Sequence, residues 1–309
     1  MAGRNTTYHL FDITLARRTQ VSPSMVRFTF TGPEVDRMTT HAPDQRIKLF
    51  FPSQAGGLEA LAEIARLESD WYAAYRALPD ASRPPMRTYT IRALRPEHGE
   101  VDVEFVLHGD NGPASRWAMH ARPGDRLAMT APTTEVEGPR LGFEWRPPRD
   151  VQRILLVADE TALPAVAGIL ETLDALPSTP RVEALLEVPR STDVQALEHP
   201  ADLYWLPRDT VPGTGHGDRL LHELRNIDLR REVLALDGQS DTADANDEPD
   251  TGRLLWESAA LDDEAPFYAW VAAESRVAMG IRRYLINECG LPKRYVTSMG
   301  YWRLGKAIG

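Results

Sequence analysis

The sequence predicts a β + α/β protein: an antiparallel β-barrel at residues 1–148, followed by an α/β domain with a parallel sheet at residues 149–309. Apolar and polar residues alternate through much of the first part, as in strands that bury one face. After Pro147-Pro148, short apolar strands alternate with helical segments, which is typical of a parallel sheet. The chain has 309 residues, 42% of them hydrophobic, which is enough for two cores.

Five alternating segments predict strands of the barrel. They are "MVRFTFTG", "RIKLFF", "MRTYTIRAL", "EVDVEFVLHG" and "GDRLAMTAPT". Residues 58–78 instead repeat apolar positions every three to four residues. That period predicts a helix inserted between two of the strands.

In the second domain, strands and helices are predicted in alternation. The strands are "RILLVA", "VEALLEV", "LYWL" and "FYAWVAA", and the helices are "LPAVAGILETL", "RLLHELRNI" and "SRVAMGIRRYLINECG". Gly290 is expected to end the last helix. Residues 237–250 contain six acids, no base and no large apolar residue, so they predict an acidic, flexible loop.

Composition excludes several classes of function. A net charge of -10 gives no overall positive field for nucleic acid or an anionic membrane. No apolar stretch approaches the ~18 residues of a membrane span, and the opening "MAGRNTTYHL" lacks the apolar core of a signal peptide, so a cytoplasmic location is expected. The only cysteine, Cys289, excludes an internal disulfide and a cysteine-ligated zinc or iron–sulfur site. The histidines show no HExxH spacing, so no metal site is expected.

Residues 87–92, "RTYTIR", combine two arginines, an aromatic residue and two threonines in one predicted strand. Alternation places Arg87 and Tyr89 on one face, and Thr88, Thr90 and Arg92 on the other. One face therefore offers a cation beside a flat ring. The alternative is a partly buried strand in which an arginine stacks on a tyrosine.

The segment "HGDNGPASRWA", residues 108–118, predicts a turn that leads into a helix. Pro113 fits the first helical turn, and the N–H groups from Gly112 onward, together with the helix dipole, form a seat for a diphosphate. An ordinary strand-to-helix turn with Ser115 as a surface residue is the alternative.

Together, in this order and spacing, the two motifs resemble the siderophore-interacting protein family of FAD-dependent ferric-siderophore reductases. "RIKLFFP", "LLVADETALPA" and "GYWRLG" extend the resemblance over nearly the whole chain. The resemblance implies a ferredoxin-reductase-like architecture, with an N-terminal antiparallel flavin-binding β-barrel and a C-terminal α/β nucleotide-binding domain. It also implies reduction of Fe(III) in a siderophore to Fe(II), which releases the iron inside the cell.

By this resemblance Tyr89 packs on the isoalloxazine, Thr90 bonds near its redox-active edge, and Arg87 meets the FAD phosphates. Arg92 belongs to the same motif. The other cofactor-binding residues that the resemblance implies are His108, Gly112, Ala114, Ser115 and Trp117, although Trp117 could equally belong to the core.

The turn "DETALPA" after the strand "RILLVA" has no glycine, and Asp159 and Glu160 would repel a diphosphate. The turn nevertheless resembles the family's own signature, so Asp159, Thr161 and Ala162 are cofactor-binding candidates. The electron donor stays open between NADH, NADPH and reduced ferredoxin. Glu187 at a strand end could accept from a ribose hydroxyl, although acids are common at strand ends.

An acidic protein needs local cations to bind an anionic ferric siderophore. Arg46 and Lys48 alternate in one strand and share a face, and Arg303 and Lys306 follow Tyr301-Trp302. These four are the substrate-binding candidates, with Lys48 the strongest, against the alternative of surface cations with packed stems. No nucleophile or general base is required.

Two rival functions remain at this stage. One is a general flavin or ferredoxin-type reductase with another acceptor. The other is a siderophore-binding module without turnover, which would be colourless when purified.

Overall fold

The computed structural model describes residues 7–53, 57–65, 71–110, 112–135, 137–197, 199–236, 256–259 and 264–305. The chain forms two compact units, Met1–Phe143 and Glu144–Ile308. The predicted acidic loop at 237–250 and the candidate Lys306 lie outside the described residues.

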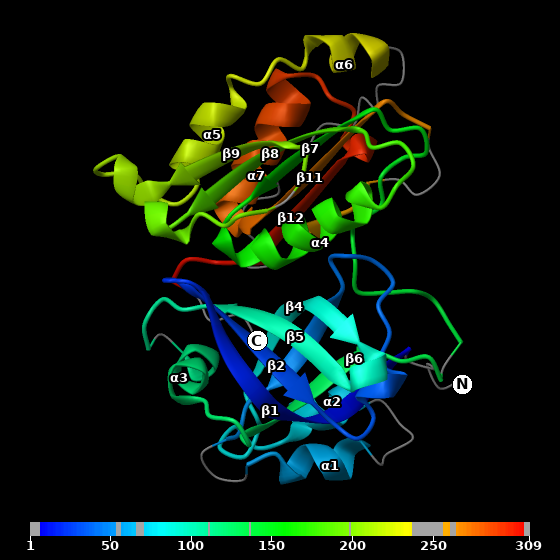
Figure 1. Ribbon diagram of the computed structural model, residues 1–309, viewed down its shortest axis with the longest axis vertical. Helices are drawn as coiled ribbons and strands as arrows, with labels where there is room; N and C mark the ends of the chain where they lie inside the picture. Colours follow the sequence, from blue (N-terminus) through cyan, green and yellow to red (C-terminus); the bar gives the residue numbers. More distant parts are fainter. Residues whose placement is uncertain are drawn as a thin grey trace. The chain divides into compact units, whose positions relative to one another are not determined.

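The first unit is a closed antiparallel barrel with the strand order β1-β2-β5-β4-β3-β6 (Figure 1). Its strands are β1 (Tyr8–Ser22), β2 (Met25–Thr31), β3 (Arg46–Phe50), β4 (Met86–Arg95), β5 (Glu100–Val106) and β6 (Arg126–Pro132). Inward residues of these strands are apolar, so one core fills the barrel. The predicted antiparallel barrel is confirmed.

Three helices accompany the barrel: α1 (Glu59–Ala65), α2 (Trp71–Ala77) and α3 (Pro113–His120). The first two occupy the predicted insertion between β3 and β4. Leu61, Ile64 and Tyr75 of the insertion pack against Phe50, Met86 and Ala128 of the barrel strands. Helix α3 packs against the barrel core instead, through Ala114 and Ala118.

The second unit contains a six-stranded sheet with the order β10-β12-β11-β7-β8-β9. The strands are β7 (Arg153–Ala158), β8 (Arg181–Val188), β9 (Asp202–Pro207), β10 (Trp256–Glu257), β11 (Phe267–Glu274) and β12 (Val296–Trp302). All neighbours run parallel except the short edge strand β10, which is antiparallel to β12. The predicted parallel sheet therefore has an antiparallel edge, and β10 and β12 were not predicted.

Helices cover both faces of this sheet (Figure 1). Helix α4 (Leu163–Asp174) lies on one face. On the other face, α5 (Asp218–Leu224), α6 (Arg230–Leu236) and α7 (Ser275–Arg283) share a core with the sheet. A π-helical turn, Tyr284–Glu288, prolongs α7, and Gly290 follows with a φ of 82°, as expected of a residue that ends a helix. No helix in the described parts of the chain is long and apolar enough to span a bilayer.

Candidate functional site

The pairing of β3 with β4 brings two cations and two threonines onto one outer face of the barrel. Arg46 lies opposite Thr90, and Lys48 lies opposite Thr88. Lys48 Nζ donates a hydrogen bond of 2.6 Å to Thr88 Oγ1. Burial, and then the charge of Arg46, lower the pKa of the Lys48 amine. The ammonium is thus held in a defined position beside a second cation.

The opposite face of the same two strands carries the predicted cation and ring. Arg87 pairs with Leu49 and Tyr89 with Ile47, so Arg87 and Tyr89 share one face, as the alternation predicts. The Tyr89 ring stacks on Phe105, with centroids 4.1 Å apart and planes at 29°. Burial raises the pKa of the Tyr89 hydroxyl. Tyr89 is therefore a ring packed on one side against the barrel.

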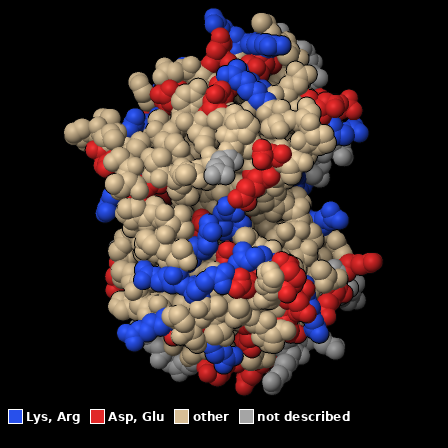
Figure 2. All heavy atoms as spheres, viewed as in Figure 1, with Lys and Arg blue, Asp and Glu red and all other residues tan. Residues whose placement is uncertain are grey.

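Arg92 is separated from this pair by an irregularity in the β4–β5 ladder between Ile91 and Ala93. Its Nε lies 3.9 Å from Glu104 Oε1, and Arg27 Nε donates to the same oxygen at 2.9 Å. Basic and acidic side chains are interspersed over the face of the molecule that Figure 2 shows. The structure therefore places Arg92 in an ion-pair network with Arg27 and Glu104.

The N-terminus of α3 is open. Gly112 is the N-cap, and no side chain caps the helix. Apart from the residues next to it in the chain, no described atom lies within 4 Å of a Cβ added at Gly112, so there is space for a ligand beside the first turn. Ala114 and Ser115 are buried in that turn, and His108 is exposed in the segment that precedes it. Uncapped N–H groups beside open space fit the diphosphate of FAD.

Phe105 connects the two motifs. Its ring contacts Tyr89, and its centroid lies 6.0 Å from that of Trp117 on α3. The "RTYTIR" strand and the "NGPAS" turn are therefore neighbours in the fold, although 15 residues lie between Arg92 and His108 in the sequence. The Trp117 ring centroid also lies 5.2 Å from that of Phe28 and 5.8 Å from that of Phe51. Trp117 therefore packs against the barrel core, which is the alternative that the sequence left open.

The turn after β7 is built around the buried carboxylate of Asp159. Its Oδ1 accepts from Thr161 N at 2.9 Å and Thr161 Oγ1 at 2.5 Å. Its Oδ2 accepts from Glu274 N at 2.7 Å and Trp302 Nε1 at 2.8 Å. Burial and the charge of Glu160 raise the pKa of Asp159, against the hydrogen bonds that it accepts. Asp159 therefore joins the ends of β7, β11 and β12.

The side chains of this turn contact other parts of the protein, and its role toward a cofactor stays a prediction. Asp159 and Thr161 bind each other, and Ala162 is 0% exposed. Glu187, the residue that could accept from a ribose hydroxyl, is buried in the structure. Glu187 is 0% exposed, and its Oε1 accepts from Arg208 at 3.0 Å and from Gly217 N at 2.8 Å.

The substrate-binding candidates are only partly brought together. Arg46 and Lys48 lie on neighbouring rungs of the barrel. Arg303 is 9% exposed just beyond β12, which counts against the alternative of a surface cation, and its role in substrate binding stays a prediction. Thr88 was missed as a site residue, because only the register of β3 on β4 shows that it holds Lys48.

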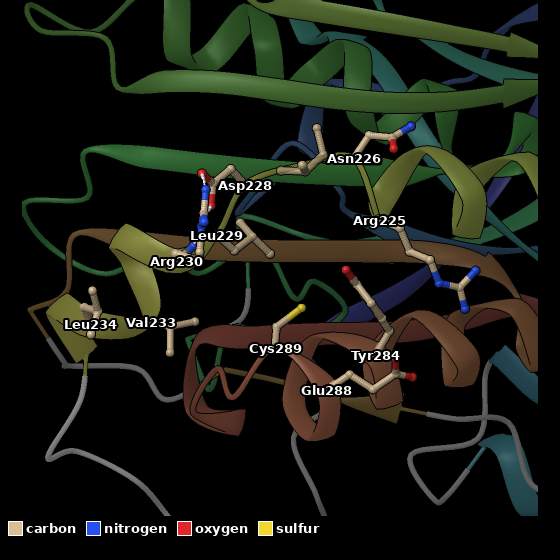
Figure 3. A pocket seen from close by; sticks show the side chains of 11 residues that line it. Arg225, Asn226, Asp228, Leu229, Arg230, Val233, Leu234, Tyr284, Glu288 and Cys289 are labelled. Atoms are coloured by element: carbon tan, nitrogen blue, oxygen red, sulfur yellow. Dashed lines mark hydrogen bonds and ion pairs between the residues drawn. The ribbon is translucent and has the colours of Figure 1, made fainter.

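A cavity of about 650 Å³ lies elsewhere in the second unit, between the end of α5, α6 and the turn after α7 (Figure 3). Arg225, Asp228, Arg230 and Tyr284 are among its lining residues, and none of the predicted site residues is. Arg153, the first residue of β7, donates to Asp228 O at 2.9 Å. The cavity therefore lies at the amino ends of the strands, opposite the edge where parallel sheets bind ligands.

Comparisons with known families cover both units. Residues 14–136 match the Siderophore-interacting FAD-binding domain, and residues 151–305 match the Siderophore-interacting protein domain. The chain belongs to the siderophore-interacting protein family. Its barrel is accordingly an FAD-binding domain, in agreement with the open seat at α3.

Relatives of this siderophore-interacting protein include the ferric vibriobactin reductase ViuB of Vibrio cholerae, 26% identical over 94% of this chain and 88% of that one. The NADPH-dependent ferric-chelate reductase of Escherichia coli is 32% identical over 64% of this chain and 71% of its own length.

Solved structures of the family share the fold. The siderophore-interacting protein SipS from Aeromonas hydrophila is 26% identical, with a TM-score of 0.62 over 98% of this chain and 94% of that one. A siderophore utilization protein from T. fusca is 24% identical, with a TM-score of 0.66 over 99% and 97% of the two chains.

Proposed function

We propose that this chain is an FAD-dependent ferric-siderophore reductase that takes electrons from NADH, NADPH or reduced ferredoxin and converts Fe(III) in a siderophore to Fe(II). The observation that carries the proposal is the β3–β4 ladder. Within a few rungs it holds the proposed flavin residues Arg87 and Tyr89 on one face and the cations Arg46 and Lys48 on the other. The names of two relatives, a ferric vibriobactin reductase and a ferric-chelate reductase, support the same activity.

When bound, FAD would accept electrons from a donor of one or two electrons and pass them singly to Fe(III). The residues of this chain bind and orient. N–H groups of Ala114 and Ser115, with the Arg87 guanidinium, would hold the diphosphate. Tyr89 would pack on the isoalloxazine, with the Thr90 backbone near its redox-active edge.

Lys48 and Arg46 would attract an anionic ferric chelate to the outer face of the barrel. Reduction weakens the chelate, because hard anionic oxygen ligands hold the less charge-dense Fe(II) less tightly than Fe(III). Release therefore follows electron transfer without a protein nucleophile or base.

The test is a two-step anaerobic experiment on the purified flavoprotein. The flavin is reduced photochemically and then mixed with ferric chelates in the presence of a chromogenic Fe(II) chelator. We expect reoxidation with two Fe(II) formed per FAD. A colourless protein would instead favour a siderophore-binding module. Reoxidation by free flavin or a protein acceptor, but by no ferric chelate, would favour a general reductase.

A further inference from the structure

Two buried carboxylates hold the chain where β12 ends. Asp159, which follows β7, is 3% exposed, and Glu274, the last residue of β11, is 4% exposed. Trp302 Nε1 donates to Asp159 Oδ2 at 2.8 Å. Leu304 N donates to Glu274 Oε1 at 3.2 Å. These two bonds lie on either side of Arg303, the substrate-binding candidate, and we call Asp159 and Glu274 the carboxylate clamp.

Each carboxylate of the clamp uses its other oxygen to fix its own turn. Asp159 Oδ1 accepts from Thr161 N at 2.9 Å and from Thr161 Oγ1 at 2.5 Å. Glu274 Oε2 accepts from Arg276 N at 2.7 Å and Val277 N at 3.2 Å, and so caps α7. Asp159 Oδ2 also accepts from Glu274 N at 2.7 Å. Because ionised acceptors make stronger hydrogen bonds than neutral ones, the clamp ties the end of β12 firmly to the turn before α4 and to the start of α7.

The backbone path that leads to Arg303 is also fixed. Pairing of β12 with β11 is regular up to Gly300 and resumes at Trp302. Tyr301 is therefore the extra residue of a bulge, and a bulge re-aims side chains of its strand. A Cβ at Gly300 would lie 2.9 Å from Ser275 Oγ and 3.0 Å from Ser275 Cα, so a larger residue would push the strand away. The bulge and the clamp together determine where Arg303 leaves the sheet.

A fixed backbone favours binding of an anion by Arg303. Ordering a long side chain when a ligand binds costs free energy. Arg303 is only 9% exposed, so part of that order is present before the ligand arrives. A guanidinium held in this way presents its planar set of donors to an anionic ligand in one geometry.

We propose that the carboxylate clamp positions Arg303 to bind an anionic ferric chelate, and that Asp159 and Glu274 act through the end of β12 rather than by contact with the substrate. This inference rests on the proposed function and deepens it, because it assigns positioning residues for its substrate. It follows that loss of one bond of the clamp should weaken binding of the chelate through Arg303.

The test removes one bond of the clamp and keeps the aromatic ring. Trp302→Phe loses the indole N–H, whereas its ring can still pack against His216, whose ring centroid lies 5.0 Å from that of Trp302. Trp256→Phe is the matched control. Trp256 Nε1 also donates at 2.8 Å to a buried carboxylate, that of Glu144, in the same unit. Thermal unfolding of both variants measures the purely structural loss.

Photochemically reduced flavoprotein is mixed anaerobically with an excess of an anionic tris-catecholate Fe(III) chelate or a neutral trihydroxamate Fe(III) chelate. For the anionic chelate, Trp302→Phe should raise the half-saturation concentration about two- to tenfold and change the limiting rate less, as expected when one more side chain must be ordered on binding. The rise should be smaller for the neutral chelate. Arg303→Ala should raise the half-saturation concentration at least as much, and adding Trp302→Phe to Arg303→Ala should cause no further rise.

Three results would each overturn the proposal: an unchanged half-saturation concentration in Trp302→Phe, an equal rise in Trp256→Phe, or a further rise when Trp302→Phe is added to Arg303→Ala. Failure of the wild type to reoxidise with any ferric chelate rejects the reductase function instead. The Ga(III) tris-catecholate has the same charge and is not reduced, so its binding then tests the clamp alone. Weaker binding by Trp302→Phe than by Trp256→Phe supports the clamp, and equal binding contradicts it.

Discussion

Lys48 Nζ donates a 2.6 Å hydrogen bond to Thr88 Oγ1 across the β3–β4 ladder. The bond fixes the ammonium group on the outer face of the barrel. Arg46 lies on the next rung of the same face. We therefore expect these two cations to make KM depend on the charge of the ferric chelate.

Lys48→Ala should raise KM for an anionic ferric chelate several-fold and change kcat less, because the charge attracts both the bound chelate and its transition state. A partly exposed charge accounts for about 1 kcal/mol. The loss should shrink as ionic strength rises from ~10 to ~150 mM. Lys293→Ala is the matched control, and equal kinetics with anionic and neutral chelates in all three proteins would contradict the assignment.

The pH dependence of KM should identify Lys48 independently. Because burial and Arg46 lower the pKa of this amine below its ordinary 10.5, the ammonium charge is lost at a lower pH than for a free lysine. KM for an anionic chelate should therefore rise on the alkaline side, at a lower pH than that at which a free lysine loses its charge. Lys48→Arg keeps its charge there and should remove the rise. The same alkaline limb in the arginine variant would assign it to another group.

Gly112→Val should lower FAD content without destabilising the apoprotein. The φ of Gly112 is 166°, which is extended backbone that valine adopts, and a Cβ there meets no protein atom within 4 Å. The added methyl groups would project into the space over the α3 N-terminus. Flavin absorbance per chain and thermal unfolding of the apoprotein measure the two effects. Full FAD occupancy would show that the diphosphate lies elsewhere.

Tyr89→Ala should lose flavin, whereas Tyr89→Phe should keep it. The ring face stacked on Phe105 is present in both tyrosine and phenylalanine, and an aromatic pair contributes about 1 kcal/mol beyond its buried area. Flavin retention during gel filtration distinguishes the variants. Equal retention in Tyr89→Ala would remove Tyr89 from the cofactor site.

Asp159→Asn should destabilise the second unit by about 3 kcal/mol, because an amide cannot accept all the hydrogen bonds that the carboxylate accepts. Folding raises the pKa of Asp159 above 3.8, so the folded state binds its proton more tightly than the unfolded state. The stabilisation that this provides is lost as pH rises through the folded pKa. The difference in the free energy of unfolding between wild type and variant, measured with urea, should therefore narrow from about pH 4.5 to 8. Asp174→Asn, at an exposed position, is the control. A difference in the free energy of unfolding between wild type and Asp159→Asn that widens as pH rises would contradict this prediction.

Alternation and helical period were sufficient to predict the barrel and the core of the α/β sheet. They did not reveal β12, because Val296–Trp302 includes Ser298 and Gly300 and has no simple alternation. The edge strand β10 has only two residues, too few for any period. Its pairing depends on a distant neighbour, Met299.

The sequence predicted those features of the candidate site that involve residues of a single strand. The shared face of Arg87 and Tyr89 follows from alternation alone. The partners of Arg92, Asp159 and Thr88 come from other strands, so their roles depend on register and on burial. A motif therefore identified the family but could not separate residues that face a ligand from residues that join strand ends.

The insertion of α1 and α2 lies outside the hydrogen-bonded circuit of the barrel, because β3 pairs directly with β4 on one side and β6 on the other. Changing the length of a connection between paired strands costs little, about 0.6 kcal/mol for each doubling of a flexible loop. Evolution can therefore lengthen, shorten or replace this insertion while the six strands keep their register. Such a change of length would leave the proposed flavin-binding residues of β4 in their register.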